Sequence, residues 1–210
     1  MNIIIIGAGD HTRVVIDALL SAGETITGMT DASAGLHGGS LLGVPVLGPD
    51  DVLGDHGPET TRLVVGVGSA DLPTARRSIF EKFKAQGYGF ANVIHPAAVI
   101  GREVRLGEGV HIMAGAVIQP FAVIGDNAIV NTRAGVDHDC RIGAHTHIAP
   151  GATLSGGISV GAGSHIGCGA TVLQGLSIGH GVLVAAGATV CHDIPNGARV
   201  AGTPAKGIAR

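Results

Sequence analysis

The first 90 residues alternate apolar runs with stretches of helical periodicity. Short apolar runs, typical of buried strands, cover residues 2–6, 25–29 and 63–67. Apolar side chains spaced three or four positions apart indicate helices over residues 12–22 and 73–87. The order strand, helix, strand, strand, helix predicts a small α/β domain with a parallel sheet. Its ligand site would lie at the carboxyl ends of the strands.

A different pattern begins at residue 94, where Ile, Leu or Val occupies every sixth position as far as residue 190. Seventeen aliphatic residues at this spacing fit neither a helix nor a hairpin sheet, and are typical of a β-helix built from short strands. Three faces of six residues make one coil of eighteen. Glycines recur at that larger period, and we expect them to take positive φ at one corner: Gly107, Gly125, Gly143, Gly161 and Gly179.

The composition agrees with tightly stacked, repetitive strands. The chain of 210 residues has 36 Gly and no Trp, so its core must consist of Val, Ile, Leu and Ala. We therefore expect two domains. A Rossmann-like α/β domain would cover residues 1–90. A left-handed parallel β-helix of hexapeptide repeats, with a closing loop at its end, would cover residues 91–210.

Charge and cysteine content exclude several classes of function. A net charge of −3 without a long basic run argues against nucleic acid or an anionic membrane surface as a partner. No apolar run approaches the length of a membrane span, and the apolar N-terminus lacks the basic region of a signal peptide. The cysteines, Cys140, Cys168 and Cys191, are odd in number and far apart, which indicates neither a disulfide framework nor a thiolate metal site. We expect a cytoplasmic protein.

Three short motifs extend the picture over nearly the whole chain. They are Gly-Ala-Gly-Asp-His at residues 7–11, Val-Asp-His-Asp-Cys at 136–140 and Ala-Gly-Thr-Pro-Ala-Lys at 201–206. With the repeats, these motifs resemble the sugar-modifying branch of the bacterial hexapeptide acyltransferases. That branch includes sialic acid O-acetyltransferases and N-acetyltransferases of nucleotide-linked 4-amino-sugars such as bacillosamine and perosamine precursors. The resemblance implies acetyl-CoA as acyl donor and a homotrimer with active sites at the subunit seams.

The same resemblance implies where the nucleotide-sugar binds, namely the first turn and the ends of neighbouring strands. The turn departs from the usual Gly-x-Gly-His-Gly, because Asp10 and Thr12 replace glycines. Thr12 also removes the third glycine of a dinucleotide motif, which argues against NAD. The positions implicated are Gly9, Asp10, His11, Thr30, Asp31 and Gly68.

His138 is the candidate general base. Acyl transfer from a thioester requires a base for the acceptor's proton and donors for the developing oxyanion. An imidazole near its ordinary pKa of about 6.5 suits the first role. Asp137 or Asp139 could orient the ring, and the resemblance favours Asp139. The alternative is an ordinary exposed coil residue. For coenzyme A, the resemblance implies His147, Gly156, Cys168, Ala186 and Lys206, with the Gly156 N–H facing the thioester oxygen.

Other functions remain open. Some β-helix trimers resembling γ-class carbonic anhydrases bind zinc through histidines, including an H-x4-H pair, but here no two histidines lie five residues apart, so we expect no metal. His111, His165 and His180 are expected to have no functional role. We expect N-acetylation of a nucleotide-linked 4-amino-4,6-dideoxy sugar in surface-glycan biosynthesis. Sugar O-acetylation is the alternative reaction. A non-catalytic trimeric scaffold or sugar-nucleotide sensor is the alternative of another class.

Overall fold

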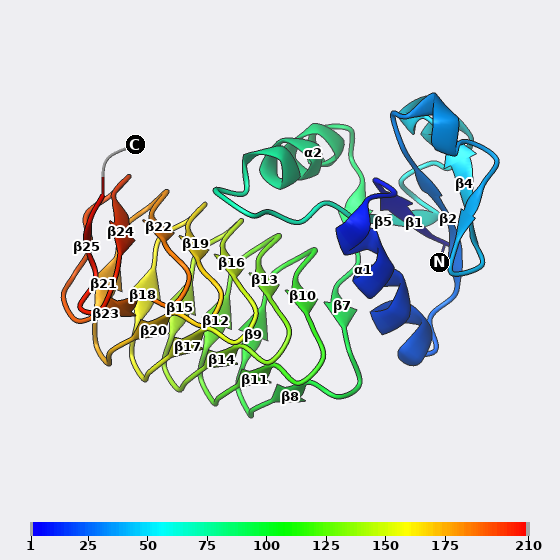
Figure 1. Cartoon of the computed structure of the whole chain (residues 1–210). Coiled ribbons are helices and arrows are strands. Elements are labelled where there is room, and N and C mark those ends of the chain that lie inside the picture. The colour runs from blue at the N-terminus through cyan, green and yellow to red at the C-terminus, as the bar shows by residue number, and fades with distance from the viewer. Residues whose placement is uncertain (1, 209–210) are drawn as a thin grey trace.

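The computed structural model describes residues 2–208 and has two parts. Figure 1 shows an α/β domain at the N-terminus and, beside it, a β-helix whose coils stack in a row toward the C-terminus. Helix α2 (Thr74–Ala85) lies along one side of the β-helix, and α1 (Asp10–Ser21) packs against its first strand. The N-terminal domain therefore covers part of one face of the β-helix.

The N-terminal sheet has six strands in the order β3-β4-β2-β1-β5-β6. All neighbouring pairs are parallel except β3 and β4, which form a hairpin. The predicted parallel sheet is confirmed, but the sequence patterns did not indicate β3, β4 or β6, which are short or interrupted by proline. The strands are β1 (Asn2–Ile6), β2 (Ile26–Thr30), β3 (Ser40–Leu41), β4 (Val44–Gly48), β5 (Thr61–Val65) and β6 (Gly89–Phe90).

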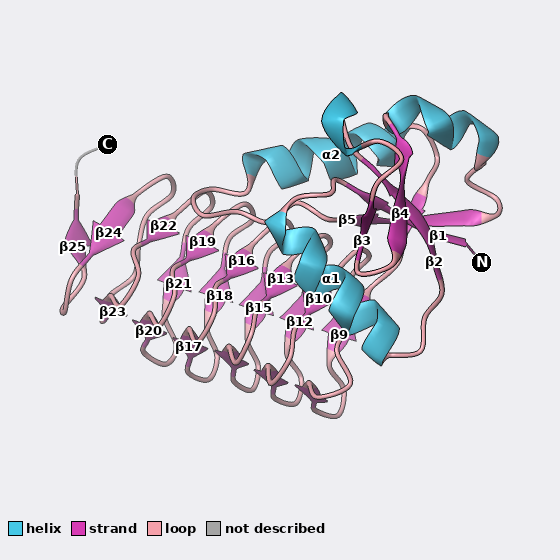
Figure 2. Ribbon diagram, turned by 45° about the vertical axis from the view of Figure 1, so that its right-hand side comes forward, coloured by secondary structure: helices cyan, strands magenta, loops and turns pink. Residues whose placement is uncertain are grey.

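Helices α1 and α2 cover opposite faces of this sheet, as Figure 2 shows. Alternate residues of β1 point to the two sides: Ile3 and Ile5 pack with α1, whereas Ile4 and Ile6 pack with the α2 side. A strand buried on both faces must be apolar throughout, which explains the continuous run at its start. Two 3₁₀ helices, η1 (Ala34–Leu36) and η2 (Asp50–Asp55), lie in the connections around β4.

The second part is a left-handed parallel β-helix with three faces, and strands β7 to β23 have two residues each. Face I contains β7 (Val93–Ile94), β10 (His111–Ile112), β13 (Ile129–Val130), β16 (His147–Ile148), β19 (His165–Ile166), β22 (Leu183–Val184), β24 (Arg199–Ala201) and the antiparallel β25 (Lys206–Gly207). Face II contains β8 (Val99–Ile100), β11 (Val117–Ile118), β14 (Gly135–Val136), β17 (Thr153–Leu154), β20 (Thr171–Val172) and β23 (Thr189–Val190). Face III contains β9 (Arg105–Leu106), β12 (Val123–Ile124), β15 (Arg141–Ile142), β18 (Ser159–Val160) and β21 (Ser177–Ile178).

The aliphatic residue at every sixth position is the second residue of each strand and fills the prism. Burial fails only in the first coil, where Ile94 is 37% and Ile100 is 36% exposed and Leu106 is half-buried, because no coil stacks beneath them. The eighteen-residue spacing therefore sets which side chains form one column, and neighbours in a column pack directly on each other.

The expected reason for the glycines spaced by eighteen residues was wrong. None of the five takes a positive φ. Instead, a Cβ on Gly143 would lie 2.5 Å from the Ala162 nitrogen, and one on Gly161 would lie 2.5 Å from the His180 nitrogen. The column needs glycine because successive coils approach too closely for any side chain.

Arg76 of α2 fastens the two parts together. Its guanidinium is fully buried and, within residues 2–208, donates hydrogen bonds to four backbone carbonyls and to no carboxylate. Two acceptors, Val65 and Val67, lie at and just past the end of β5, and two, Gly109 and Asn127, belong to the β-helix. Burial lowers the pKa of Arg76 to about 9, so the group keeps its charge at neutral pH.

Candidate functional site

The crevice of the N-terminal sheet opens where β1 lies between β2 and β5. The chain passes from β1 outward to β2 and β4 and then returns to the other side of β1 with β5. A reversal of strand order of this kind marks the ligand site of open α/β sheets. The turn that follows β1, residues 7–11, and the loop that follows β5, residues 66–73, both lie at this edge.

Thr12 closes the back of the crevice. Its buried hydroxyl lies 2.7 Å from the Gly7 carbonyl and 3.1 Å from the Gly66 carbonyl, so it ties the ends of β1 and β5 together. The threonine fills the space that a dinucleotide motif leaves for close packing of helix and strand with its third glycine. The departure from the family pattern at this position is therefore structural.

Thr30 and Asp31 shape the same edge from the end of β2. The Thr30 hydroxyl is buried and donates to Asp50, while Asp31 accepts the Ala8 N–H at 2.7 Å and the Ser33 N–H at 2.8 Å. Both carboxylate oxygens of Asp31 thus hold backbone turns. Asp10 points into solvent at the first turn of α1, with a side chain 102% exposed and a 3.8 Å contact to Arg13.

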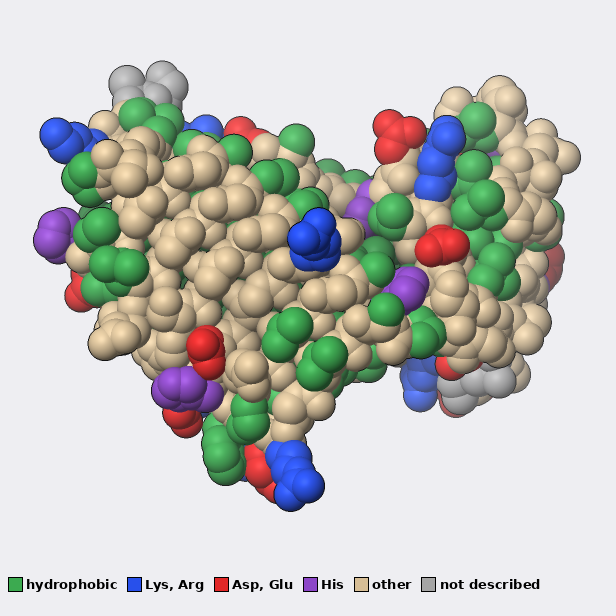
Figure 3. Space-filling view, turned by 60° about the horizontal axis from the view of Figure 1, so that its bottom comes forward, with side chains coloured by type: hydrophobic (Ala, Val, Ile, Leu, Met, Phe, Trp, Pro, Cys, Tyr) green, Lys and Arg blue, Asp and Glu red, His purple; other side chains and the backbone are tan. Residues whose placement is uncertain are grey.

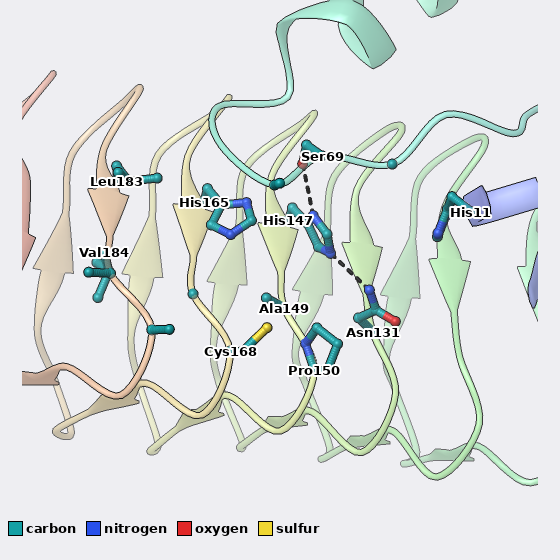
Figure 4. Close-up of a pocket in the computed structure, with 15 residues that line it drawn as sticks. His11, Ser69, Asn131, His147, Ala149, Pro150, His165, Cys168, Leu183 and Val184 are labelled. Atoms are coloured by element: carbon teal, nitrogen blue, oxygen red, sulfur yellow. Dashed lines mark hydrogen bonds between the residues drawn. The ribbon is translucent and has the colours of Figure 1, made fainter. Parts of the chain in front are cut away.

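A cavity of about 590 Å³, the main cavity, lies between the loop after β5 and face I. Its volume is in the range of small-molecule sites. Figure 4 shows His147 and His165 on neighbouring strands of face I and Asn131 just past the end of the strand before them, with Ser69 above and His11 to one side. Sequence-predicted residues from both domains meet here: His11, Gly68, His147, Cys168 and Ala186.

His147 is held in a single tautomer. The Asn131 side-chain oxygen accepts the Thr132 N–H at 2.7 Å, which turns the amide nitrogen toward Nε2 of His147 at 3.0 Å. That ring nitrogen must accept, so the proton sits on Nδ1 and is donated to the Ser69 hydroxyl at 2.8 Å. Burial, with a smaller effect of His165, lowers the pKa of His147 to about 3. His147 is therefore a neutral group that joins the loop to face I.

A second pair of histidines lies at the crevice end of the main cavity. Nε2 of His11 lies 3.4 Å from Nδ1 of His111, and the rings are stacked. Burial lowers the pKa of His11 to about 4 and also lowers the pKa of His111, which is fully buried beneath the N-terminal domain. The histidine lining at neutral pH is thus uncharged, and no Lys, Arg, Asp or Glu occurs among the described residues that line the cavity.

His138 and Asp139 form a pair at a different edge of the prism, the corner between faces II and III. Nδ1 of His138 lies 2.8 Å from Oδ2 of Asp139, whereas Asp137 accepts the His138 backbone N–H at 2.7 Å. The structure therefore selects Asp139 as the partner of the ring. That hydrogen bond raises the pKa of His138, and the charge of Asp137 adds to the effect. The pair is exposed, so Nε2 is free to meet another molecule.

Gly156 lies directly against this histidine, one coil further along. A Cβ at Gly156 would lie 2.5 Å from Nε2 of His138, so only glycine leaves room for the ring. Among residues 2–208 the Gly156 N–H has no hydrogen-bond acceptor. The hollow lined by His138 and Gly156 measures about 360 Å³ and also includes Gln174. The glycine thus provides space for the base and a free donor beside it.

The predicted site residues consequently lie in separate places within one chain, with Gly9, Asp10, Thr30 and Asp31 at the crevice edge of the N-terminal sheet. The main cavity unites residues of both domains, whereas His138, Asp139 and Gly156 lie at the corner between faces II and III. Lys206 is exposed in β25 at the far end of the β-helix and lines none of these hollows. His165, for which the sequence predicted no role, lines the main cavity and is 94% buried. Ser69 and Asn131 also belong to the cavity, and no motif pointed to them.

The combination of domains is that of the hexapeptide-repeat acyltransferases. Residues 2–83 match the PglD N-terminal domain, and residues 121–156 match the bacterial transferase hexapeptide of six repeats. Among solved structures, the chain is 41% identical to PerB from Caulobacter crescentus in complex with CoA and GDP-perosamine. That match has a TM-score of 0.91 and covers 100% of this chain and 98% of that chain.

Two further structures are similar over almost their full length. The acetyltransferase domain of PglB from Neisseria gonorrhoeae is 39% identical, with a TM-score of 0.90 and coverage of 99% of both chains. WeeI from Acinetobacter baumannii is 27% identical, with a TM-score of 0.87 and coverage of 99% of this chain and 100% of that chain. The protein belongs to the hexapeptide-repeat sugar acetyltransferases with a PglD-type N-terminal domain, which confirms the resemblance seen in the sequence.

Within residues 2–208, no group of three or more His, Cys, Asp or Glu side chains is placed to hold a metal ion. No helix in the same range has both the length and the apolar character needed to cross a bilayer.

Proposed function

We propose that this protein transfers the acetyl group of acetyl-CoA to the amino group of a nucleotide-linked amino-sugar of the 4-amino-4,6-dideoxy type, in surface-glycan biosynthesis. The observation that carries the proposal is the full-length similarity to PerB, a perosamine N-acetyltransferase with CoA and GDP-perosamine bound. The sequence identity of 41% extends over both domains, so it includes the crevice of the N-terminal sheet as well as the transferase repeats.

His138 acts as general base in this proposal. Its free Nε2 accepts a proton from the sugar amine as the nitrogen attacks the thioester carbonyl. The new N–C bond forms and the C–S bond breaks. The His138 imidazolium then gives its proton to the leaving thiolate, so coenzyme A departs as the free thiol and the base is regenerated. Asp139 accepts a hydrogen bond from the Nδ1–H of His138. This bond fixes the tautomer and stabilises the imidazolium that forms. The free N–H of Gly156 is the candidate donor to the oxyanion.

We further propose that each active site forms between two copies of the chain. Support comes from the separation of the two groups of site residues. His138 lies at the corner between faces II and III, whereas Cys168 and Ala186 line the main cavity at the corner after face I. If the corner between faces II and III of one copy lies against the corner after face I of a second copy, His138 and the main cavity come together. A closed ring of three such contacts gives a homotrimer.

The nucleotide-sugar would enter from the crevice of the N-terminal sheet. His11 and Gly68 belong both to this edge of the sheet and to the lining of the main cavity, so a ligand bound at the crevice extends toward face I. Gly9 leaves the turn without a side chain, since nothing lies within 4 Å of its Cβ position. Coenzyme A would occupy the part of the cavity near Cys168 and Ala186.

The test is a kinetic panel with His138→Ala as the reference variant. The protein is mixed with acetyl-CoA and UDP- or GDP-linked 4-amino-sugars, CMP-sialic acid or free sialic acid, and thiol release is followed. Turnover with a 4-amino-sugar nucleotide that falls at least about a hundredfold in the variant supports the proposal. Full turnover in the variant, with the trimer intact, would overturn the assignment of the base.

The same panel separates the alternatives. Thiol release with the sialic acid compounds alone would make the protein a sugar O-acetyltransferase. Silence with every acceptor and no binding of coenzyme A would favour the non-catalytic scaffold, for which the hydrogen-bonded pair of His138 and Asp139 has no use.

A further inference from the structure

Arg133 is an exposed cation at a position that otherwise favours glycine. It stands at the corner that follows face I. Glycines occupy the same place in other coils with φ between 64° and 69°: Gly115, Gly151, Gly169 and Gly187. Arg133 adopts a φ of 57° there. A bulky residue in this left-handed region is strained, and such strain is concentrated at functional positions.

Two of the other non-glycine residues with positive φ in the β-helix use their side chains in polar contacts, whereas Glu103 and Phe121 are exposed. Asp139 accepts the ring proton of His138, while Asn127 binds both Arg76 and His145. Arg133 has no comparable partner: among residues 2–208, no carboxylate lies within 4.0 Å of its guanidinium and no acceptor for it is found. The guanidinium of Arg133 is therefore available for a contact outside the chain itself.

The side chain borders the main cavity on the side of the N-terminal domain. Arg133 lines a neighbouring hollow of about 420 Å³ with Thr132, Pro150 and Gly151, and Pro150 also lines the main cavity. The Arg133 Cγ lies 3.3 Å from the Cβ position of Gly115, so the stem leans toward the coil nearer the N-terminus. In Figure 3, which brings the lower part of Figure 1 forward, basic groups on the β-helix are few and isolated.

The main cavity itself has no cation to meet a phosphate. Its described lining contains no Lys or Arg, and its histidines are neutral because burial lowers the pKa of His11, His147 and His165. Both substrates of the proposed reaction carry a diphosphate, which arginine binds with two parallel hydrogen bonds. The hollow that shares Pro150 with the main cavity contributes Arg133.

We propose that Arg133 binds a phosphate group of a substrate held in the main cavity, and that this substrate is the nucleotide-sugar. The inference rests on the proposed function and adds a binding residue to it. The chemistry of this contact is phosphate recognition, which the diphosphate of coenzyme A would share. The Arg133 side chain leans toward Gly115, in the coil nearer the N-terminal domain. This direction favours the nucleotide-sugar as its partner.

The test is calorimetric binding of GDP, UDP, CMP and CoA to the wild-type protein and to Arg133→Gly. Glycine suits the backbone of this corner, so the variant keeps the fold, and its melting temperature is expected to equal or exceed that of the wild type. Arg141→Ala is the matched control, because Arg141 is an exposed arginine on face III, away from the cavity.

We expect Arg133→Gly to lower the affinity for the nucleotide that the wild type binds by about tenfold or more, and to leave the affinity for CoA unchanged. The Arg141→Ala control should bind every ligand as the wild type does. Weakened binding of CoA alone would still establish phosphate recognition but would assign the phosphate to coenzyme A. Equal binding of all four ligands to wild type and Arg133→Gly would overturn the inference while leaving the proposed function intact. A wild-type protein that binds none of them would overturn both.

Discussion

Asp139 controls the chemistry available to His138. Its Oδ2 lies 2.8 Å from Nδ1 of the ring, and this hydrogen bond raises the pKa of the imidazole. Only the neutral ring can accept a proton, so kcat/KM should fall as the pH drops through this raised pKa. In Asp139→Asn the pKa falls, and the acidic limb should move to lower pH. The maximal rate should drop at least about tenfold, since the amide no longer fixes the tautomer. Profiles of kcat/KM between about pH 5 and 9 measure both effects.

Glu103→Gln is the control for this residue. Glu103 occupies the same corner position two coils earlier, also with a positive φ. The substitution Glu103→Gln removes a carboxylate without changing the contact of the His138 ring. Its profile should match the wild type. An unmoved limb in Asp139→Asn would mean that the group titrating in the rate is not the pair described here.

At the scale of elements, α2 matters chiefly through Arg76, which joins the end of β5 to the β-helix. Arg76→Ala leaves four buried carbonyls without a donor, and we expect a loss of about 3 kcal/mol or more in the free energy of unfolding. Arg76→Lys should recover only part, because an ammonium cannot reach acceptors on both sides as a guanidinium fork does. Urea denaturation measures both changes.

The adjacent Arg77 is the comparison for that experiment. It is exposed and pairs with Glu81 at 2.8 Å on the helix surface, so Arg77→Ala should change the stability by about 0.5 kcal/mol or less. Similar losses for Arg76→Ala and Arg77→Ala would show that the four buried hydrogen bonds do not hold the two parts together.

On the scale of the whole molecule, the buried histidines between the domains make stability depend on pH. The pKa of His11 is lowered to about 4 and that of His147 to about 3, against about 6.5 in the unfolded chain. Between these values the unfolded state binds protons that the folded state does not, so stability falls as the pH drops below about 6.5. We expect a loss of about 1–2 kcal/mol per histidine between pH 7 and 5. Calorimetry on wild type and His147→Gln should show the smaller pH effect in the variant. Equal slopes would contradict this assignment.

The assembly proposed for the active site can be tested by mixing two inactive chains. His138→Ala lacks the base, and Cys168→Trp fills the main cavity with an indole. If each site takes the base from one subunit and the cavity from the next, randomly mixed trimers should regain about a quarter of the wild-type activity. Sites contained in single chains would leave the mixture inactive.

Patterns with a short repeat predicted most of the fold. The six-residue spacing from Ile94 onward determined the strands and the inward side chains, because each coil repeats the same local geometry and stacks on the next. The continuous apolar run of β1 identified a strand buried on both faces. The motif around His138 identified a candidate base, because its carboxylate partner is the next residue in the chain.

Contacts between distant segments were decided only by the tertiary structure. Ser69 meets His147 across 78 residues and Arg76 meets Asn127 across 51, and neither distance leaves a periodic signal. The spacing of Gly143 and Gly161 was visible, but its cause, the close approach of the next coil, was not. By itself the sequence determined the coils and the chemistry at one corner, since both depend on near neighbours. The docking of the N-terminal domain created the main cavity and its neutral histidines, because burial by a distant segment is what lowers their pKa.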